Sequence, residues 1–255
     1  MYKILANTLF MGRRLVFVPE CHSTNSLALE LSQKQDLPEG TLVITNHQFR
    51  GRGQQGNVWI SEAGKNLTFS LVVKPSFLAI KDQFLLNMVV SLGVRDFVQS
   101  KVSQSVNVKW PNDILVDERK ICGILIENQI QGTGFTNSII GIGLNVNQKG
   151  FHLNNAVSLT MASGRGYELQ EVLEGICSYL EKWYLVLKQR GVDRVKQSYL
   201  KVMFGLNESR NFSTNGRQFT GVIIGVDNNG RLMIKENGET HFFNTKEVQF
   251  DFESY

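Results

Sequence analysis

The chain has 255 residues, a formal net charge of +4 and a hydrophobic share of 42%. This composition excludes a disordered or low-complexity protein and allows a substantial buried core. The small charge excess permits a phosphorylated partner, but it is too sparse for a protein that coats DNA.

The cysteines and the apolar segments indicate a soluble protein of the cytoplasm. Cys21, Cys122 and Cys177 have no metal-ligand spacing, and their odd number fits a reducing compartment. No apolar core of a signal peptide precedes residue 20. The long uncharged stretch 128–148 is broken by glycines and asparagines, so it does not predict a membrane helix.

In chain order, the sequence predicts strands that alternate with helices. A strand is expected at 14–19, followed by a helix at 23–35 whose N-cap is Ser23 or Thr24. Residues 66–73 alternate apolar side chains with a period of two, which predicts a half-buried strand. Further strands are expected at 41–48, 105–109, 113–116, 120–127 and 137–146, and helices at 82–101, 169–190 and 193–204.

The pattern changes after Leu206, where short alternating runs are separated by Asn-Gly pairs at 215–216, 229–230 and 237–238. Asn-Gly readily supplies the positive φ of a tight hairpin turn. About five short strands in this segment predict a small barrel of its own. We therefore expect a catalytic domain at 1–205 and a small C-terminal domain at 206–255.

A glycine-rich loop lies between two predicted strands, with the sequence GRGQQGNVW at 51–59. Its glycines let backbone N–H groups approach an anion, and Arg52 can add a bidentate contact. The loop lacks the Lys and Ser/Thr that complete a Walker A motif, so a P-loop NTPase is disfavoured. A flexible hairpin tip is the alternative explanation.

The segment KWPND at 109–113 forms a second motif. Pro111 fixes the backbone, so that Asn112 and Asp113 are presented at the start of a strand. An amide beside a carboxylate that can bind Mg²⁺ suits a nucleotide site, and Lys120 can reach it across a hairpin. The alternative is a structural turn with a solvated Asp–Lys pair.

The third motif, GIGLNV at 141–146, begins like a dinucleotide fingerprint but lacks its last glycine and the following helix. We therefore reject a Rossmann site. Gly141 and Gly143 are expected to let another backbone or a flat ring pack against the strand.

Five motifs occur in the order and approximate spacing of biotin–protein ligases, and the resemblance covers almost the whole chain. They are Ser23-Thr24-Asn25, GRGQQGNVW, KWPND, Arg119-Lys120 with Gly123, and GIGLNVN. The resemblance implies an α+β fold, with a class II synthetase-like central mixed β-sheet flanked by helices and a small SH3-like C-terminal β-barrel. It also implies that ATP activates biotin to biotinyl-5′-AMP, and that biotin then passes to a lysine of a biotin carboxyl carrier domain.

The resemblance also assigns site residues. Those matched to biotin are Ser23, Thr24, Asn25, Gln48, Gly51, Arg52, Gly53, Gln54, Trp59, Lys120 and Gly123. Those matched to ATP are Arg52, Asn57, Trp59, Lys109, Asn112, Lys120 and Asn145, with Asp113 as a ligand of Mg²⁺. Lys120 and Arg52 are the implied catalytic cations, because both reactants are anions.

The sequence departs from the family pattern in two places. Many members have Arg where this chain has Gln54 and Asn57, so one or two phosphate contacts are expected either to be weaker here or to come from Lys65 or Lys109. Only 22 residues precede Ser23, too few for the DNA-binding domain of bifunctional members, so we expect no sequence-specific DNA binding and no repressor function. A monomer and a homodimer both remain open.

Two other functions are weighed against biotin ligation. A lipoate–protein ligase has a similar fold, but KWPND and the polar pair Ser23-Thr24 favour biotin. A non-catalytic nucleic-acid-binding protein would suit a small barrel, but residues 206–255 have more acidic than basic side chains. The excess of positive charge instead falls at 40–81, a segment with five basic residues and one acidic residue, Glu62. This local excess predicts an anion site.

Overall fold

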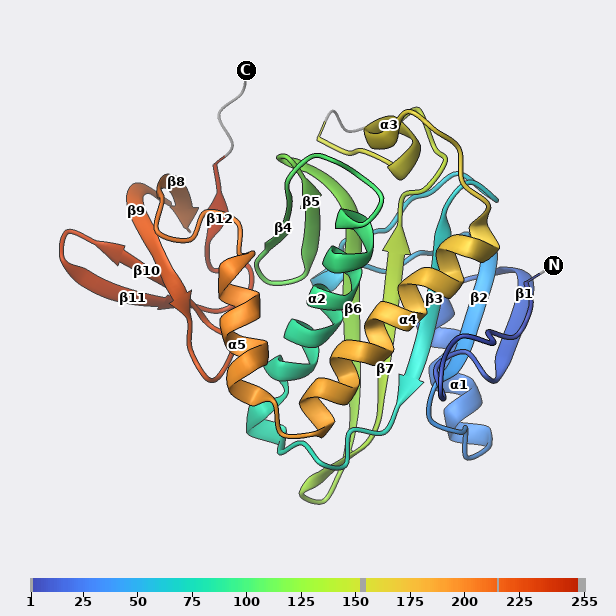
Figure 1. Cartoon of the computed structure of the whole chain (residues 1–255). Helices are drawn as coiled ribbons and strands as arrows, with labels where there is room; N and C mark the ends of the chain where they lie inside the picture. Colours follow the sequence, from blue (N-terminus) through green and yellow to red (C-terminus); the bar gives the residue numbers. More distant parts are fainter. Residues whose placement is uncertain (1, 152–154, 215, 252–255) are drawn as a thin grey trace.

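The computed structural model describes residues 2–151, 155–214 and 216–251. Within these residues a mixed sheet of seven strands forms the centre of the molecule (Figure 1). Across the sheet the strands are β1 (Leu15–Cys21), β2 (Thr41–Gln48), β3 (Leu67–Val73), β7 (Gly134–Leu144), β6 (Arg119–Gln131), β5 (Asp113–Val116) and β4 (Val106–Lys109). Strands β1 and β2 are parallel and the other neighbours are antiparallel, which confirms the expected mixed sheet.

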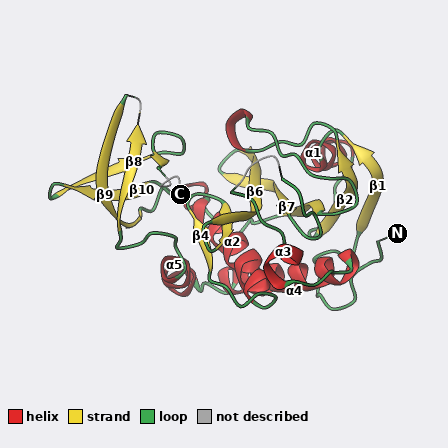
Figure 2. Ribbon diagram, turned by 90° about the horizontal axis from the view of Figure 1, so that it is seen from above, coloured by secondary structure: helices red, strands yellow, loops and turns green. Residues whose placement is uncertain are grey.

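Helices cover the two faces of this sheet unequally (Figure 2). Helices α2 (Phe84–Gln99) and α4 (Leu169–Lys188) pack together on one face, whereas α1 (Thr24–Lys34) lies on the other. All seven residues of β3 are buried, so the prediction of a half-buried strand was wrong. The strand is central in the sheet, and α1 contacts it on the face that the alternating pattern left to solvent.

Helix α1 begins close to its predicted position, with Ser23 as an N-cap of extended backbone conformation. The Ser23 side chain makes no capping hydrogen bond, so this hydroxyl does not serve the helix. Short helices that the sequence did not predict are η1 (Gln54–Gly56), η2 (Ile80–Asp82) and α3 (Leu159–Ser163). Among the described residues, no helix combines the length and the apolar character that a membrane crossing requires.

The outer edge of β4 is covered by the segment that follows α5 (Val192–Lys201). The Val108 N–H donates to Val202 O at 2.8 Å, and the Phe204 N–H donates to Val108 O at 2.9 Å. The chain therefore satisfies the backbone groups of this edge before it enters the C-terminal segment.

The C-terminal segment forms an antiparallel sheet of five strands in the described part of the chain. The strands, in spatial order, are β11 (Glu239–Phe243), β10 (Leu232–Glu236), β9 (Arg217–Val226), β8 (Ser209–Thr214) and β12 (Gln249–Phe250). Positive φ at Asn237 and Gly238 confirms the predicted Asn-Gly turn there, whereas Asn215 lies outside the described residues. The expected closed barrel is not observed among the described residues, where the two outer strands do not pair.

The C-terminal sheet is fastened to the central part beside the KWPND turn (Figure 1). The indole Nε1 of Trp110 donates to Gly230 O at 2.9 Å. The ring of Phe84 lies so close to Gly230 that an added Cβ would come within 2.5 Å of it. These contacts hold the hairpin between β9 and β10 against α2 and the turn.

Candidate active site

A cavity of about 600 Å³ lies where α1, β2, β6, β7, the glycine-rich loop, the KWPND turn and the C-terminal sheet meet. All but two of the predicted site residues line it: Ser23, Thr24, Asn25, Gln48, Arg52, Gly53, Gln54, Asn57, Trp59, Lys109, Asn112, Asp113, Lys120 and Gly123. Residues from distant parts of the sequence therefore meet in one place, as the motifs predicted.

One end of the cavity is polar and neutral. The N–H and the hydroxyl of Thr24 both donate to Gln48 Oε1, at 2.7 and 3.1 Å. These bonds orient the Gln48 amide, so that its Nε2 is directed away from Thr24. Ser23 lines the same end, and its hydroxyl is not used as a helix cap. This end can offer both donors and acceptors to a buried polar group of a ligand.

The floor of the cavity is made by glycines of β6 and β7. A Cβ on Gly143 would lie 2.4 Å from Cε2 of Trp59, and a Cβ on Gly123 would lie 3.2 Å from its Cζ3. A Cβ on Gly141 would meet Asn25 Oδ1 at 2.3 Å. Of the two partners expected at these glycines, a backbone or a flat ring, the ring of Trp59 packs against Gly143, whereas Gly141 is covered by the Asn25 side chain.

Trp59 is placed by packing and not by a directed bond. Its Nε1 is buried and has no hydrogen-bond partner among the described residues. The backbone N–H of Trp59, in contrast, donates to Gly51 O at 3.0 Å, and this bond closes the base of the glycine-rich loop. A Cβ on Gly51 would lie 2.2 Å from Trp59 O, so the loop can close in this way only with glycine there.

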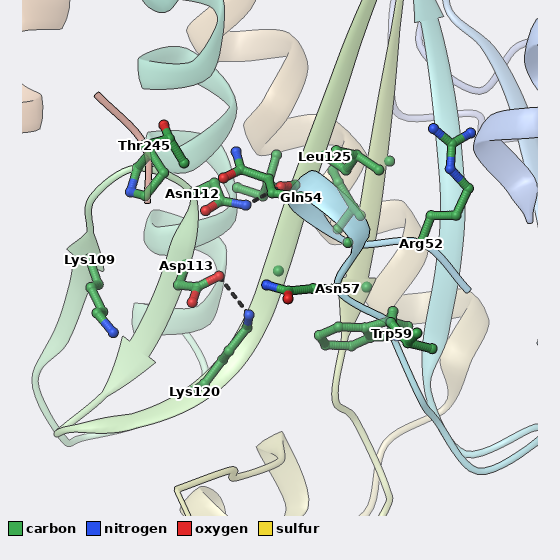
Figure 3. Close-up of a pocket in the computed structure, with 18 of the residues that line it drawn as sticks. Arg52, Gln54, Asn57, Trp59, Lys109, Asn112, Asp113, Lys120, Leu125 and Thr245 are labelled. Carbon is green, nitrogen blue, oxygen red and sulfur yellow. Dashed lines mark hydrogen bonds and ion pairs between the residues drawn. The ribbon is translucent and has the colours of Figure 1, made fainter. Parts of the chain in front are cut away.

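The other end of the cavity carries charge (Figure 3). Lys120 Nζ lies 2.7 Å from Asp113 Oδ1 and 5.8 Å from the centroid of a Trp59 ring. Lys109 lines the same end, and its pKa is lowered. The main cause is burial, to which the charge of Lys120 adds, while the charge of Asp113 acts in the opposite direction. Lys120 lies at the start of β6, and its backbone is held there by hydrogen bonds with Asn155 and Val157.

The KWPND turn contributes structure as well as side chains. The Trp110–Pro111 peptide bond is cis, and the Asn112 Nδ2 donates to Ile124 O on β6. The Ile124 N–H donates back to Asn112 O at 3.1 Å. The turn is thus bonded to β6, and Asp113 begins β5 opposite Gly123.

Arg52 lines the cavity, but its guanidinium is engaged elsewhere. Nη2 forms an ion pair with Glu127, and Nη1 donates to Ser26 Oγ at 3.0 Å. Figure 3 shows this side chain directed away from Lys120, whereas Asn57 lies between Trp59 and the Lys120–Asp113 pair in the same view. The two implied catalytic cations therefore do not converge on one point in this conformation.

Gly51 and Asn145 do not line the cavity. Gly51 is buried behind the loop, where its role is the close approach to Trp59. Asn145 is 3% exposed, and its Nδ2 donates to Val157 O at 3.1 Å. The assignment of Asn145 to ATP stays a prediction, and this placement gives the side chain an internal structural partner instead.

Sequence reasoning missed the part of the cavity that comes from the C-terminal sheet. These lining residues are Thr245, Lys246, Val248, Gln249 and Phe250. Lys246 has positive φ, and Lys109 Nζ lies 5.1 Å from the centroid of the Phe250 ring. No motif in this segment indicated a site. The segment has more acidic than basic side chains, so its overall charge did not point to Lys246 as a cavity residue.

The prediction that the basic residues of 40–81 form the anion site was also wrong. Of its five cations, Arg52 alone lines the cavity. Lys74 instead forms an ion pair with Asp36, far along the sequence from the loop. Lys65 does not line the cavity whereas Lys109 does, which leaves Lys109 as the replacement cation that the sequence analysis named. The lining cations are Arg52, Lys109, Lys120 and Lys246.

Asp113 is the single acidic residue among those that line the cavity, and no cluster of three or more metal-binding side chains occurs in the described part of the chain. Mg²⁺ often keeps only one or two protein carboxylates and completes its shell with phosphate and water. Asp113 fits that limited role. Its present partner is Lys120.

The cavity can therefore hold an elongated ligand with a neutral polar head at one end and anionic groups at the other. Among the residues that the structure describes, no histidine or cysteine lines the cavity. Burial raises the pKa of the Cys122 and Cys177 thiols, so these cysteines are poor nucleophiles. This arrangement favours positioning and charge stabilisation over a covalent enzyme intermediate.

Comparison with known proteins places these features in one family. The sequence profile of the biotin/lipoate A/B protein ligase family matches residues 18–145. The bifunctional ligase/repressor BirA of Bacillus subtilis is 30% identical over 89% of this chain and 71% of its own length. The biotin–[acetyl-CoA-carboxylase] ligase of Paracoccus denitrificans is 28% identical over 84% of this chain and 90% of its own length.

The fold agrees with solved structures. The biotin protein ligase of Aquifex aeolicus in complex with biotin and ATP superimposes with a TM-score of 0.77. It is 24% identical, and the match covers 94% of this chain and 99% of that one. The shared architecture therefore extends through the C-terminal sheet as well as the central one.

Proposed function

The chain belongs to the biotin/lipoate A/B protein ligase family, and we propose that within it the chain is an ATP-dependent biotin–protein ligase. The observation that carries this proposal is one cavity with the Thr24–Gln48 pair at a neutral end and the Lys120–Asp113 pair at a charged end. Relatives named as biotin ligases support the same substrate.

The proposed reaction has two steps. A carboxylate oxygen of biotin attacks the α-phosphorus of ATP, the bond from that phosphorus to the bridging oxygen of pyrophosphate breaks, and biotinyl-5′-AMP forms. The ε-amine of a lysine in a biotin carboxyl carrier domain then attacks the acyl carbon. AMP leaves with the electron pair of the broken C–O bond, and the amine loses a proton.

We propose that the neutral end binds the ureido ring of biotin. That ring offers N–H donors and a carbonyl acceptor, and leaving them unpaired on burial would be costly. Ser23, Thr24 and Gln48 carry the matching groups. Gln48 is already oriented by Thr24, so its Nε2 is set to donate to a ligand carbonyl. The glycine floor and Trp59 would then enclose the less polar part of the molecule.

The charged end suits the second half of the reaction site. Biotin carboxylate and ATP are both anions, so their close approach needs cations that are already in place. Lys120 is held by its backbone and by Asp113, and Lys109 and Lys246 line the same cavity. We assign Lys120 to the reacting groups and Lys109 and Lys246 to the polyphosphate. Asn112 and Asn57 remain proposed ATP contacts.

Asp113 would be the protein ligand of a Mg²⁺ ion, which would neutralise phosphate charge when bound. Other ligands would have to come from phosphate and water, because Asp113 is the one carboxylate that lines the cavity in the described part of the chain. Lys120 would then exchange its contact with Asp113 for a contact with the substrate.

We further propose that 1–205 and 206–255 act as two domains that build this cavity together. Five lining residues of the second segment support this division of labour: Thr245, Lys246, Val248, Gln249 and Phe250. For these 255 residues we propose ligation without repressor function, although several relatives are named as bifunctional ligases and repressors. Because the reaction consumes ATP, we expect it to take place in the cytoplasm.

The decisive experiment is ATP–pyrophosphate exchange with biotin, with lipoate and with no acid. Exchange with biotin alone is expected, followed by transfer of biotin to a purified carrier domain. Exchange with lipoate and not biotin would reverse the substrate assignment. No exchange in any condition would favour a non-catalytic role. Sequence-specific binding of the chain to biotin-operon DNA would contradict the absence of repressor function.

A further inference from the structure

Glu127, on β6, joins two parts of the site although it does not line the cavity. Its Oε1 forms the ion pair with Arg52 of the glycine-rich loop. Its Oε2 accepts a hydrogen bond of 2.8 Å from Asn25 Nδ2 in α1. One carboxylate thus bridges the loop and the helix, and each of its oxygens has a separate partner.

Asn25 carries this connection into the protein interior. Its Nδ2 also donates to Leu125 O at 3.2 Å, and its Oδ1 lies 2.6 Å from the hydroxyl of Ser70. Asn25 is 3% exposed and presses against Gly141, where a Cβ would come within 2.3 Å of Oδ1. Both ends of this amide are therefore occupied by protein groups, and the side chain has little room for another position.

The connection continues to the neutral end of the cavity. The Ser70 hydroxyl lies 2.8 Å from Thr24 Oγ1, and Thr24 in turn fixes the Gln48 amide. A continuous chain of polar contacts therefore runs from Arg52 through Glu127, Asn25, Ser70 and Thr24 to Gln48. The glycine-rich loop and the residues proposed to bind the ureido ring share one hydrogen-bonded network.

We propose that Glu127 is a positioning residue that couples the glycine-rich loop to the ureido-binding end of the cavity. It controls biotin affinity through Arg52 and Asn25 without contacting biotin. The ligand assigned to this end rests on the proposed function, whereas the coupling itself rests on the network alone. Because both oxygens are used, neutralising the carboxylate breaks the bridge even if the side chain keeps its size.

The test is Glu127→Gln, which keeps the shape of the side chain but turns one acceptor into a donor. The matched control is Asp36→Asn, which breaks the ion pair with Lys74; neither of these residues lines the cavity. Glu127→Asp supplies a second variant, because it keeps the charge and shortens the reach by one methylene. Each protein is followed by thermal unfolding, by trypsin cleavage after Arg50 or Arg52 without substrate, and by exchange kinetics.

Glu127→Gln is expected to be cleaved in the loop about five-fold faster than the wild type, and its KM for biotin is expected to rise about ten-fold. The KM for ATP should change by less than about two-fold, because the network does not reach the charged end. Glu127→Asp should fall between the wild type and Glu127→Gln. Asp36→Asn should match the wild type in cleavage and in both KM values.

Unchanged loop cleavage and unchanged biotin KM in Glu127→Gln would overturn the proposal. So would an equal rise in both KM values with a large loss of thermal stability, since that pattern belongs to a general structural role. A fall in the biotin KM would show that Glu127 restrains Arg52, which also contradicts positioning. Faster loop cleavage in a chain that shows no biotin-dependent exchange would support the coupling and refute the proposed function, so the two can fail separately.

Discussion

Gly143→Ala offers a direct test of the packing that closes the cavity. Gly143 lies in β7 between Thr68 and Gly123 of the neighbouring strands, and its φ is not in the left-handed region. The backbone therefore accepts alanine, and the effect of the substitution comes from its Cβ. That atom would lie 2.4 Å from Cε2 and 2.7 Å from Nε1 of Trp59.

The expected size of the effect follows from these distances. Ordinary carbon contacts lie near 3.5–4.0 Å, so the indole has to move by about 1 Å or more. Overpacking of this kind costs about 1–3 kcal/mol when the surroundings cannot yield. Trp59 follows a loop and has no directed bond from Nε1, so we expect the ring and loop to move and the sheet to persist.

Gly143→Ala should therefore cause a large loss of exchange activity and only a small loss of thermal stability. A displacement of about 1 Å at a reaction site can cost up to about 100-fold in rate. We expect kcat/KM for biotin-dependent exchange to fall about 10- to 100-fold, with a decrease in Tm of less than about 4 °C. Exchange assays and thermal unfolding of the same preparation measure both quantities.

The same sheet supplies graded controls. Gly134→Ala lies on the same strand and meets no atom within 4 Å, so it should behave like the wild type. Gly123→Ala should have an intermediate effect, because its Cβ would lie 3.2 Å from Trp59. Trp59→Phe should partly relieve Gly143→Ala, since the smaller ring removes the clashing Nε1. Equal activity of Gly143→Ala and Gly134→Ala would refute the packing argument.

Three further predictions concern the charged end. Lys120→Ala should lower exchange at least about 100-fold while Tm stays close to the wild type, because the substitution removes charge stabilisation and little packing; normal exchange would exclude Lys120 from catalysis. Lys246→Ala should raise the KM for ATP about three- to ten-fold and leave that for biotin unchanged, with Lys235→Ala, outside the cavity on β10, as the control. Because burial lowers the pKa of Lys109, a bound polyphosphate should raise it again. ATP binding at an alkaline pH below the ordinary pKa of lysine should therefore take up protons, and calorimetry in buffers of different ionisation enthalpy should find no such uptake in Lys109→Met.

Much of the site could be predicted because its local motifs carry their own geometry. The glycines at 141 and 143 predicted the close approach of a backbone or a flat ring, and the Trp59 ring packs against Gly143. Lys120 was expected to reach Asp113 across a short hairpin, and the two form an ion pair at 2.7 Å. In each case a turn or a strand fixes both partners, so short-range sequence rules were sufficient.

Residues whose partners lie far away in the sequence could not be assigned in this way. Glu127 lies in a predicted strand, but its role depends on Asn25, which is 102 residues earlier in the sequence, and on Arg52, which is 75 residues earlier. Asn145 sits within a convincing motif, yet its amide holds Val157 inside the protein. Side-chain direction and long-range pairing decide these cases, and neither can be obtained from residue spacing.

The C-terminal sheet shows why averaged charge is a poor guide to a binding surface. The segment 206–255 is acidic overall, which argued against an anion partner for it as a separate domain. Lys246 nevertheless lines the same cavity as Lys109 and Phe250, and the Lys109 Nζ lies over the Phe250 ring. Trp110 holds the sheet in place through Gly230. An anion in the cavity would therefore meet the lysine at short range, while acidic side chains elsewhere on the sheet would be screened by solvent and salt.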